Sequence, residues 1–255
     1  MIFWVALRKE LLEQWRSYRL LIVGVVLLSF GLASPLLARY TPELLKLAVP
    51  PGMGPAILNL IPTPTIADAV DQYLKNMSQF GILLALLMTM GTVAQEKDKG
   101  TAALMLVKPM PRGVFLGAKF VALALTFAAS ILLAGFACYY YTLLLFGALN
   151  LPMWLAVNGL LLLSLLVYVA LTLLCSTVTR SQVVAAGMAF GVLILLSAGG
   201  AIPRVGDYLP GRLTGWAGGL AKGAAVAAWP ALWVSVGLIL AALLVAWILF
   251  ERQEL

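Results

Sequence analysis

Six long apolar stretches constrain the fold of this chain more than any other feature of its sequence. They cover roughly residues 20–38, 77–95, 117–147, 153–179, 182–202 and 231–250. The hydrocarbon core of a bilayer is about 30 Å thick and needs about 20 apolar residues per helix, so these stretches are long enough to cross it. Transmembrane β-strands would instead alternate in segments of about ten residues. The pattern predicts an all-α polytopic membrane protein with six transmembrane helices, forming a single domain over 1–255.

The composition supports the same class. Hydrophobic residues make up 63% of the chain and charged residues 11%, whereas an ordinary soluble domain is about 25% charged. The six spans and their connections use nearly all of the 255 residues. No separate soluble enzyme domain is therefore expected, and any energy source must come from another chain or from an ion gradient.

The lysines and arginines predict the orientation in the membrane. With a cytoplasmic amino terminus, eleven of the 17 lie on the cytoplasmic side, namely Arg8, Lys9, Arg16, Arg19, Lys97, Lys99, Lys108, Arg112, Lys119, Arg180 and Arg252. Because cytoplasmic loops are enriched in basic residues, both termini are predicted to be cytoplasmic, in the inner (plasma) membrane. The net charge of +7 is then a topology signal, and no nucleic-acid partner is expected.

Residues 1–19 form an amphipathic segment before the first span. Its apolar residues recur every three to four positions, and charged residues occupy the rest: Phe3, Leu7, Leu11, Trp15 and Tyr18 against Arg8, Lys9, Glu13, Arg16 and Arg19. This spacing predicts an interfacial helix with its apolar face in the lipid. Such a helix is either a simple topogenic anchor or an element that transmits the motion of a cytoplasmic partner to the first span.

Two outer connections are long enough to carry structure. In the first, Thr65 and Asp68 have the spacing of a helix cap, which predicts a short outer helix that leads into the second span. Asp68 and Asp71 could bind a cation, but carboxylates at a helix start usually interact with the helix dipole. The second connection, 203–230, is glycine-rich and is either a re-entrant element or a flexible hairpin. Within it, Arg204 and Asp207 could pair. The chain has no His, and no metal site is expected.

The cytoplasmic loop between the second and third spans has the most ordered pattern. Glu96 ends the second span, Gly100 permits a sharp turn, Thr101 can cap the run 102–107, and Pro109 stops it. Arg112 then lies at the start of the next helix. The loop is predicted to hold a short helix parallel to the membrane. An ordinary charged loop would explain the basic residues but not this order.

These loop residues carry a family resemblance. Through Glu96, Gly100-Thr101, Leu104, Pro109 and Arg112-Gly113 the chain resembles the membrane subunits of ABC transporters of the ABC-2 type that have six spans and no fused ATPase. The resemblance covers the whole chain in layout, but the sharp likeness is confined to this loop.

The resemblance implies an assembly of two permease chains, expected to form a homodimer, with two ATP-binding cassette ATPase subunits. Residues 96–112 would act as a coupling helix in a cleft of the ATPase, with Leu104, Leu106 and Val107 packed into it. Glu96 and Arg112 would hold the loop against the helix ends. The relatives are mainly exporters, so export is the expected direction.

ATP itself is expected on the partner. The sequence contains no Gly-Lys pair, so the phosphate-binding loop of nucleotide-binding proteins is absent. This chain is expected to be a transport subunit with no catalytic residues and no cofactor of its own, while ATP and Mg bind to the partner subunit.

Gly187 and Gly191 form a Gly-x-x-x-Gly pair on the fifth span. Small residues at this spacing let two helices approach closely in a membrane. The pair predicts either a dimer contact between two copies or close packing within one chain.

Two other function classes are weighed against transport by an ATPase partner. An ion channel or secondary transporter should place ionisable residues in the membrane interior, and the predicted spans contain almost none. An intramembrane protease needs paired aspartates, a Ser with a His, or a zinc motif, and none is present. The substrate cannot be inferred from the sequence, although the apolar spans are compatible with amphipathic cargo.

Overall fold

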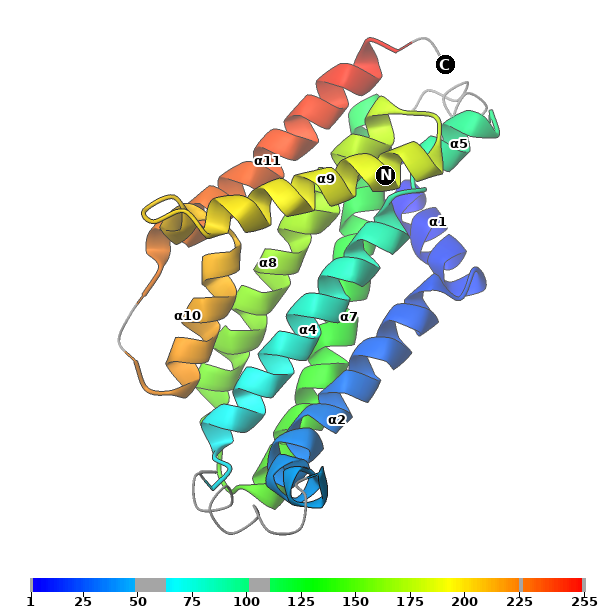
Figure 1. Cartoon of the computed structure of the whole chain (residues 1–255). Helices are drawn as coiled ribbons and strands as arrows, with labels where there is room; N and C mark the ends of the chain where they lie inside the picture. Colours follow the sequence, from blue (N-terminus) through cyan, green and yellow to red (C-terminus); the bar gives the residue numbers. More distant parts are fainter. Residues whose placement is uncertain (1, 49–62, 101–110, 225–226, 254–255) are drawn as a thin grey trace.

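The computed structural model describes residues 2–48, 63–100, 111–224 and 227–253, and these residues form helices and no strand. In chain order the elements are α1 (Ile2–Arg16), α2 (Arg19–Ala48), α4 (Ile66–Thr89), α5 (Ala94–Asp98), α7 (Arg112–Leu145), α8 (Leu151–Val178), α9 (Gln182–Gly200), η1 (Gly206–Tyr208), α10 (Gly211–Ala221) and α11 (Trp229–Glu251), as Figure 1 shows.

Six segments of the described chain are long and apolar enough to cross a membrane. They are Arg19–Leu44, Ile66–Asp98, Arg112–Leu145, Leu151–Val178, Gln182–Gly200 and Trp229–Glu251. The prediction of an all-α polytopic membrane protein is confirmed.

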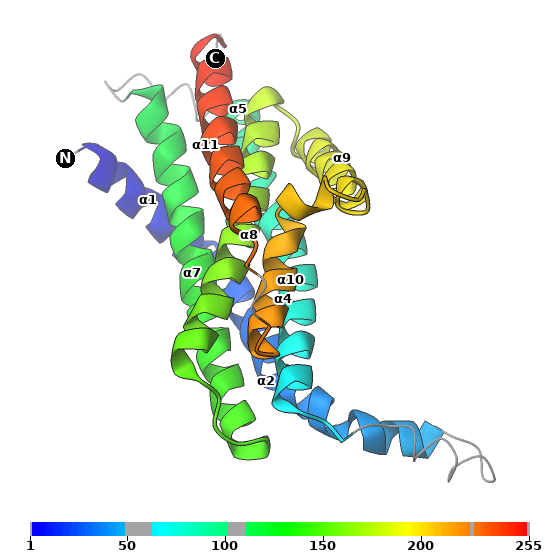
Figure 2. The ribbon, with the colours of Figure 1, turned by 90° about the vertical axis from the view of Figure 1, so that its left-hand side faces the viewer.

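Two helices run well beyond the spans predicted for them. α2 continues past residue 38 to Ala48 although it contains Pro35 and Pro42. Proline removes a helical hydrogen bond and bends the helix, and Figure 2 shows the end of α2 turning away from the bundle. α4 begins at Ile66, so the predicted short outer helix and the second span are one continuous helix. Its first turn carries the predicted cap, in which Thr65 N donates to Asp68 at 2.8 Å.

The core of the bundle lies around α8. In the most apolar part of each helix, 67% of the residues of α8 are buried, against 17% in α11 and 11% in α9. The central core includes Val23, Tyr73, Phe127 and Leu161, one each from α2, α4, α7 and α8. α9 and α11 therefore lie at the edge of a core built from these four helices (Figures 1 and 2).

Polar side chains inside the bundle are hydrogen-bonded to one another. Tyr73 Oη donates to Asn158 Oδ1 at 2.7 Å, and Trp154 Nε1 donates to the Gly135 carbonyl at 3.1 Å. A Cβ on Gly135 would lie 2.8 Å from Asn158 Oδ1, so the close approach of α7 and α8 requires glycine there. Because the bilayer interior offers no water, such internal bonds remove the cost of burying these groups.

The segment after α9 folds back onto the bundle. It forms η1 and α10, and α10 buries Leu213, Ala217 and Gly218. Leu213 and Ala217 belong to the central core. Of the two forms predicted for this segment, the structure favours a packed element over a flexible hairpin. Its ion pair joins Asp207 to Arg212, not to Arg204 as the sequence suggested.

α1, α5 and the C-terminal end of α11 lie at one end of the molecule (Figure 1). We call this the termini end. The start of α4 and the end of α10 lie at the opposite end, which we call the far end.

Candidate coupling site

The predicted coupling loop begins and ends at the termini end. Its first part is α5, which ends before Gly100 with a backbone φ of 67° at that glycine. This left-handed conformation favours glycine, as expected for a sharp turn. The loop residues Thr101, Leu104, Leu106, Val107 and Pro109 lie outside the described residues, so the predicted short helix stays a prediction.

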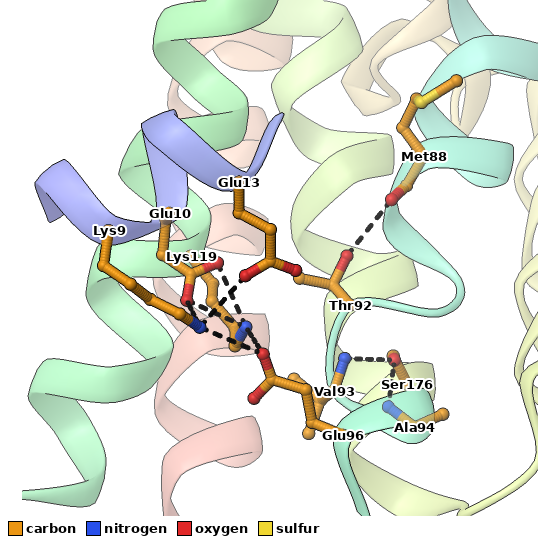
Figure 3. Close-up of polar contacts among 10 residues, drawn as sticks. All are labelled: Lys9, Glu10, Glu13, Met88, Thr92, Val93, Ala94, Glu96, Lys119 and Ser176. Atoms are coloured by element: carbon orange, nitrogen blue, oxygen red, sulfur yellow. Dashed lines mark hydrogen bonds and ion pairs between the residues drawn. The ribbon is translucent and has the colours of Figure 1, made fainter. Parts of the chain in front are cut away.

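Glu96 of α5 binds a buried lysine of α7. Lys119 has 1% of its side chain exposed, and its Nζ donates to Glu96 Oε1 at 2.7 Å (Figure 3). The same Nζ lies 3.1 Å from both carboxylate oxygens of Glu10 in α1. Lys119 thus joins the helix that enters the loop to the helix that leaves it, and both to the amino-terminal helix.

α1 docks on α7 through a partly polar face. Leu7, Glu10 and Gln14 are its buried residues, and their spacing of three and four places them on one side of the helix. Gln14 accepts a hydrogen bond from Thr126 of α7. Trp15 is 69% exposed, as a lipid-facing residue would be. The expected helix is present, and the sequence analysis did not assign Glu10 and Gln14 to a buried side.

Sequence reasoning missed Glu10 as a functional residue. On an amphipathic helix a glutamate next to lysine and arginine is expected to be solvated, and its partner Lys119 is 109 positions away. The only sequence signal was the position of Lys119 itself, an ammonium group placed inside the third apolar stretch. Such a group is costly in a bilayer and is usually paired.

Lys9 completes the charge cluster, which we define as Lys9, Glu10, Glu13, Glu96 and Lys119 (Figure 3). Lys9 Nζ lies 3.0 Å from Glu10, 3.1 Å from Glu13 and 3.4 Å from Glu96. Partial burial lowers the pKa of Lys9, but Glu10 and Glu96 raise it by more, so that pKa lies above its ordinary value. Burial raises the pKa of Glu13, but the hydrogen bond and the charge of Lys9 lower it by more, so the pKa of Glu13 lies below its ordinary value.

The carboxylates of the charge cluster resemble a metal-binding group. Oxygens of Glu10, Glu13 and Glu96 lie within 4.8 Å of one another. However, the ammonium groups of Lys9 and Lys119 already bind these oxygens. The donor set is therefore that of an ion-pair network. A cavity of about 300 Å³ lies beside it, also lined by Gln14 and Arg19.

The connection between α4 and α5 is held by a serine of α8. Ser176 Oγ accepts from the backbone N–H groups of Val93 and Ala94, at 3.1 and 3.0 Å (Figure 3). The same hydroxyl donates to the Met90 carbonyl at 2.8 Å. Helix starts leave backbone N–H groups without partners, and α5 has no capping side chain of its own. Ser176 supplies the missing acceptor and fixes Glu96 relative to α8.

Arg112, at the other end of the loop, contacts the end of α11. Its Nη1 donates to the carbonyl oxygens of Glu251 at 2.8 Å and Gln253 at 3.0 Å, and also to that of Phe250. A cation at a helix C-terminus satisfies the last carbonyls and complements the helix dipole. The two described ends of the loop are therefore attached to different helices, Glu96 to α1 and α7, and Arg112 to α11.

Gly187 and Gly191 lie on the edge helix α9. A Cβ built on either glycine meets no atom of the described chain within 4 Å. Close packing of this pair within the chain, one of the two alternatives from the sequence, is therefore not seen among the described residues. The neighbouring side chains Val183 and Leu195 are 79% and 72% exposed.

The comparisons with known proteins agree with this architecture. The family model described as ABC-2 family transporter protein matches residues 4–205, from α1 through α9. The uncharacterized transmembrane protein YxlG of Bacillus subtilis (strain 168) is 28% identical over 214 residues, which cover 81% of this chain and 80% of that protein. The residues matched by the family model include the charge cluster and the loop. This chain belongs to the ABC-2 family of transporter proteins.

Proposed function

We propose that this chain is the membrane-spanning permease subunit of an ATP-driven transporter and that its 96–112 loop couples it to a separate ATPase subunit. Family membership supports the permease role. The observation that carries the coupling role is the attachment of the two loop ends: Glu96 binds Lys119, and Arg112 binds the carbonyls at the end of α11. A force on the loop would reach the first and last helices together.

The partner supplies the nucleotide chemistry in this proposal. ATP and Mg bind to the ATPase, and closure of the ATPase pair moves the loop, whose apolar residues Leu104, Leu106 and Val107 enter the ATPase cleft. The termini end then faces the cytoplasm, in accord with the basic residues of α1 and α5 and the positive-inside rule. Transport runs outward, as it does in most relatives of this type.

The test is purification of the tagged chain from its native membrane in mild detergent. We expect a stoichiometric ATP-binding subunit by mass spectrometry, and ATP hydrolysis in the eluate. The variants Glu96→Ala and Arg112→Ala should still insert into the membrane, but they should lose either the co-purified ATP-binding subunit or its ATP hydrolysis. Arg39→Ala, which changes an exposed arginine of α2, is the matched control and should behave as the wild type. A pure chain without any ATPase would contradict the proposal and favour a channel or secondary transporter.

The second partner in this proposal is another copy of the chain, in contact through α9. Gly187 and Gly191 are uncovered within the described chain, and small residues at this spacing favour close helix pairs in membranes. A symmetric contact there would bring the two copies together at the edge of each bundle.

A further inference from the structure

A cavity of about 450 Å³ lies where α9, η1 and α10 meet α8. Its lining includes Tyr168 of α8, Ser197 of α9, and the charged residues Arg204, Asp207 and Arg212 of the segment that follows. We call it the arginine cavity. It is separate from the charge cluster, and none of the residues discussed for coupling lines it.

The arginine cavity lies deep in the membrane-spanning part of the chain. Tyr168 is ten residues before the end of α8 and 17 after its start, which at 1.5 Å per residue is about 15 Å from the termini end of the helix and about 26 Å from the far end. Figures 1 and 2 agree, because α9 ends partway along the bundle and α10 continues toward the far end.

The charged groups of the cavity favour an anion. Arg212 Nε lies 3.4 Å from Asp207 Oδ1. Among the described residues, Arg204 has no carboxylate within ion-pairing distance. The N-terminus of α10 also lines the cavity, through Pro210 and Gly211, and its first turn contains no acidic residue. Helix N-termini carry partial positive charge and bind phosphate and carboxylate groups.

The backbone holds Arg204 in an unfavourable conformation. Its φ of 71° lies in the left-handed region, where a non-glycine residue is strained. The turn is tight as well, since a Cβ on Gly206 would lie 2.4 Å from the Gly200 carbonyl oxygen. A guanidinium group at membrane depth is costly without a counter-charge. The cost of the charge is reduced if an anion binds at this position.

The surroundings of the cavity are apolar and face outward. Ile202 and Leu209 line it, and Ile202 and the adjoining Val205 are 54% and 47% exposed. An acyl chain can lie along these exposed residues while a polar head group enters the cavity. The volume is in the range of small-molecule sites.

We propose that the arginine cavity binds the anionic head group, a phosphate or a carboxylate, of an amphiphile that enters from the bilayer. Arg204 and the N-terminus of α10 contact the anion, and Arg212, oriented by Asp207, provides a second guanidinium group. Binding needs neither ATP nor the ATPase, so a failure of this proposal is distinguishable from a failure of the proposed function.

The test is photo-crosslinking in nanodiscs of phosphatidylcholine that contain the full chain. One sample holds phosphatidic acid with a diazirine in its acyl chain, and a matched sample holds phosphatidylcholine with the same diazirine. Because charge-assisted contacts to the phosphate are lost with the zwitterionic lipid, we expect about tenfold more adduct from phosphatidic acid on peptides within 194–212. Equal labelling by the two probes there would overturn the proposal.

Three variants separate binding from folding. Arg204→Gln should lower the phosphatidic acid adduct about tenfold, while Arg39→Gln, an exposed arginine of α2, should leave it unchanged. Arg204→Gly removes the guanidinium and relieves the strain at this φ, so it should lose the adduct while melting at the same or a higher temperature. An adduct that persists in Arg204→Gly would contradict the assignment. Competition by excess inorganic phosphate would show a site for free anions and would also contradict a lipid ligand.

Discussion

Lys119 is the residue on which the termini end depends most. Its side chain is almost fully buried, and its ammonium group is compensated by Glu10 and Glu96. Burying an ion costs several kcal/mol, which pairing and hydrogen bonding offset. Loss of the cation would leave the carboxylates of Glu10 and Glu96 close together, with the half-buried Lys9 as their remaining cation in the charge cluster.

Replacing Lys119 should therefore destabilise the chain strongly. We expect Lys119→Met to lower the free energy of unfolding by about 3–5 kcal/mol, as for other broken buried pairs, measured by denaturant titration in detergent micelles. Lys75→Met, at an exposed lysine of α4, should change it little.

The triple variant Lys119→Met, Glu10→Gln, Glu96→Gln checks the mechanism. It replaces the two carboxylates by neutral amides as well as removing the cation. It should therefore recover most of the stability that Lys119→Met loses. If Lys119→Met alone is as stable as the wild type, Lys119 is not the charge that holds these helices together.

At the scale of elements, α1 combines a lipid-facing side with a charged docking side. Trp4 and Trp15 are exposed, whereas Glu10 and Gln14 are buried against α7. Lys9 and Glu13 lie at the edge of this contact and bind each other at 3.1 Å, and the Lys119 ammonium group of α7 also lowers the pKa of Glu13. Because Glu13 is attracted to α7 only when it is ionised, the docking of α1 should depend on pH.

The direction of this dependence follows from the two pKa shifts. The pKa of Glu13 is lowered below its ordinary value of 4.5. The stabilisation of α1 docking by Glu13 is therefore present above pH 4.5 and is lost as the pH falls through the lowered pKa. The pKa of Lys9 is raised above 10.5, so its contribution is complete below 10.5 and is lost only at higher pH. Docking should be constant near neutral pH and weaken in acid.

A spin label on Val5→Cys, an exposed position of α1, reports this change. Its mobility should rise as the pH falls below 4.5, the ordinary value for Glu13. In a Glu13→Gln background that acid response should be smaller. If Glu13→Gln leaves the profile unchanged, Glu13 does not contribute to the docking of α1.

The sequence was sufficient for the number and type of the membrane helices, because bilayer thickness sets their length and their side chains are apolar nearly all round. It also located the Thr65 cap and the turn at Gly100, which are local features. It was insufficient for contacts between distant segments. Glu10 resembles any solvated glutamate until α7 places Lys119 beside it.

The form of the segment that holds Arg204 and Arg212 was left open between a re-entrant element and a flexible hairpin for a similar reason. Glycines and charges are compatible with both forms, and nothing in the local pattern shows that the segment folds back to the level of Tyr168. Leu213 and Ala217 provide the packing that holds it there, and their spacing of four was too short a pattern to distinguish a packed helix from a loop.

At the scale of the whole molecule, the edge position of α9 leaves a helix face for a second copy. The single-cysteine variant Gly187→Cys, made after replacing the buried Cys138 and Cys175 by Ser, should form a disulfide-linked dimer upon mild oxidation in membranes. Leu133→Cys in the same background, at a position of α7 that is 57% exposed, is the control and should stay monomeric. Dimers from Leu133→Cys alone would place the contact on another helix.

The whole-molecule account rests on the loop between α5 and α7. Its ends are attached to α1, α7 and α11, so a partner that moves the loop would move the amino-terminal helix and the third and last membrane helices. This requires that the ATPase touch the loop directly.

The most direct measurement is photo-crosslinking from the loop in the native membrane. A benzoylphenylalanine replaces Leu104, and a second variant carries it at Lys75 near the far end. The account predicts that illumination joins the Leu104 variant, and not the Lys75 variant, to an ATP-binding subunit identified by mass spectrometry. An ATPase adduct from position 75, or from neither position, would contradict the coupling role of the loop.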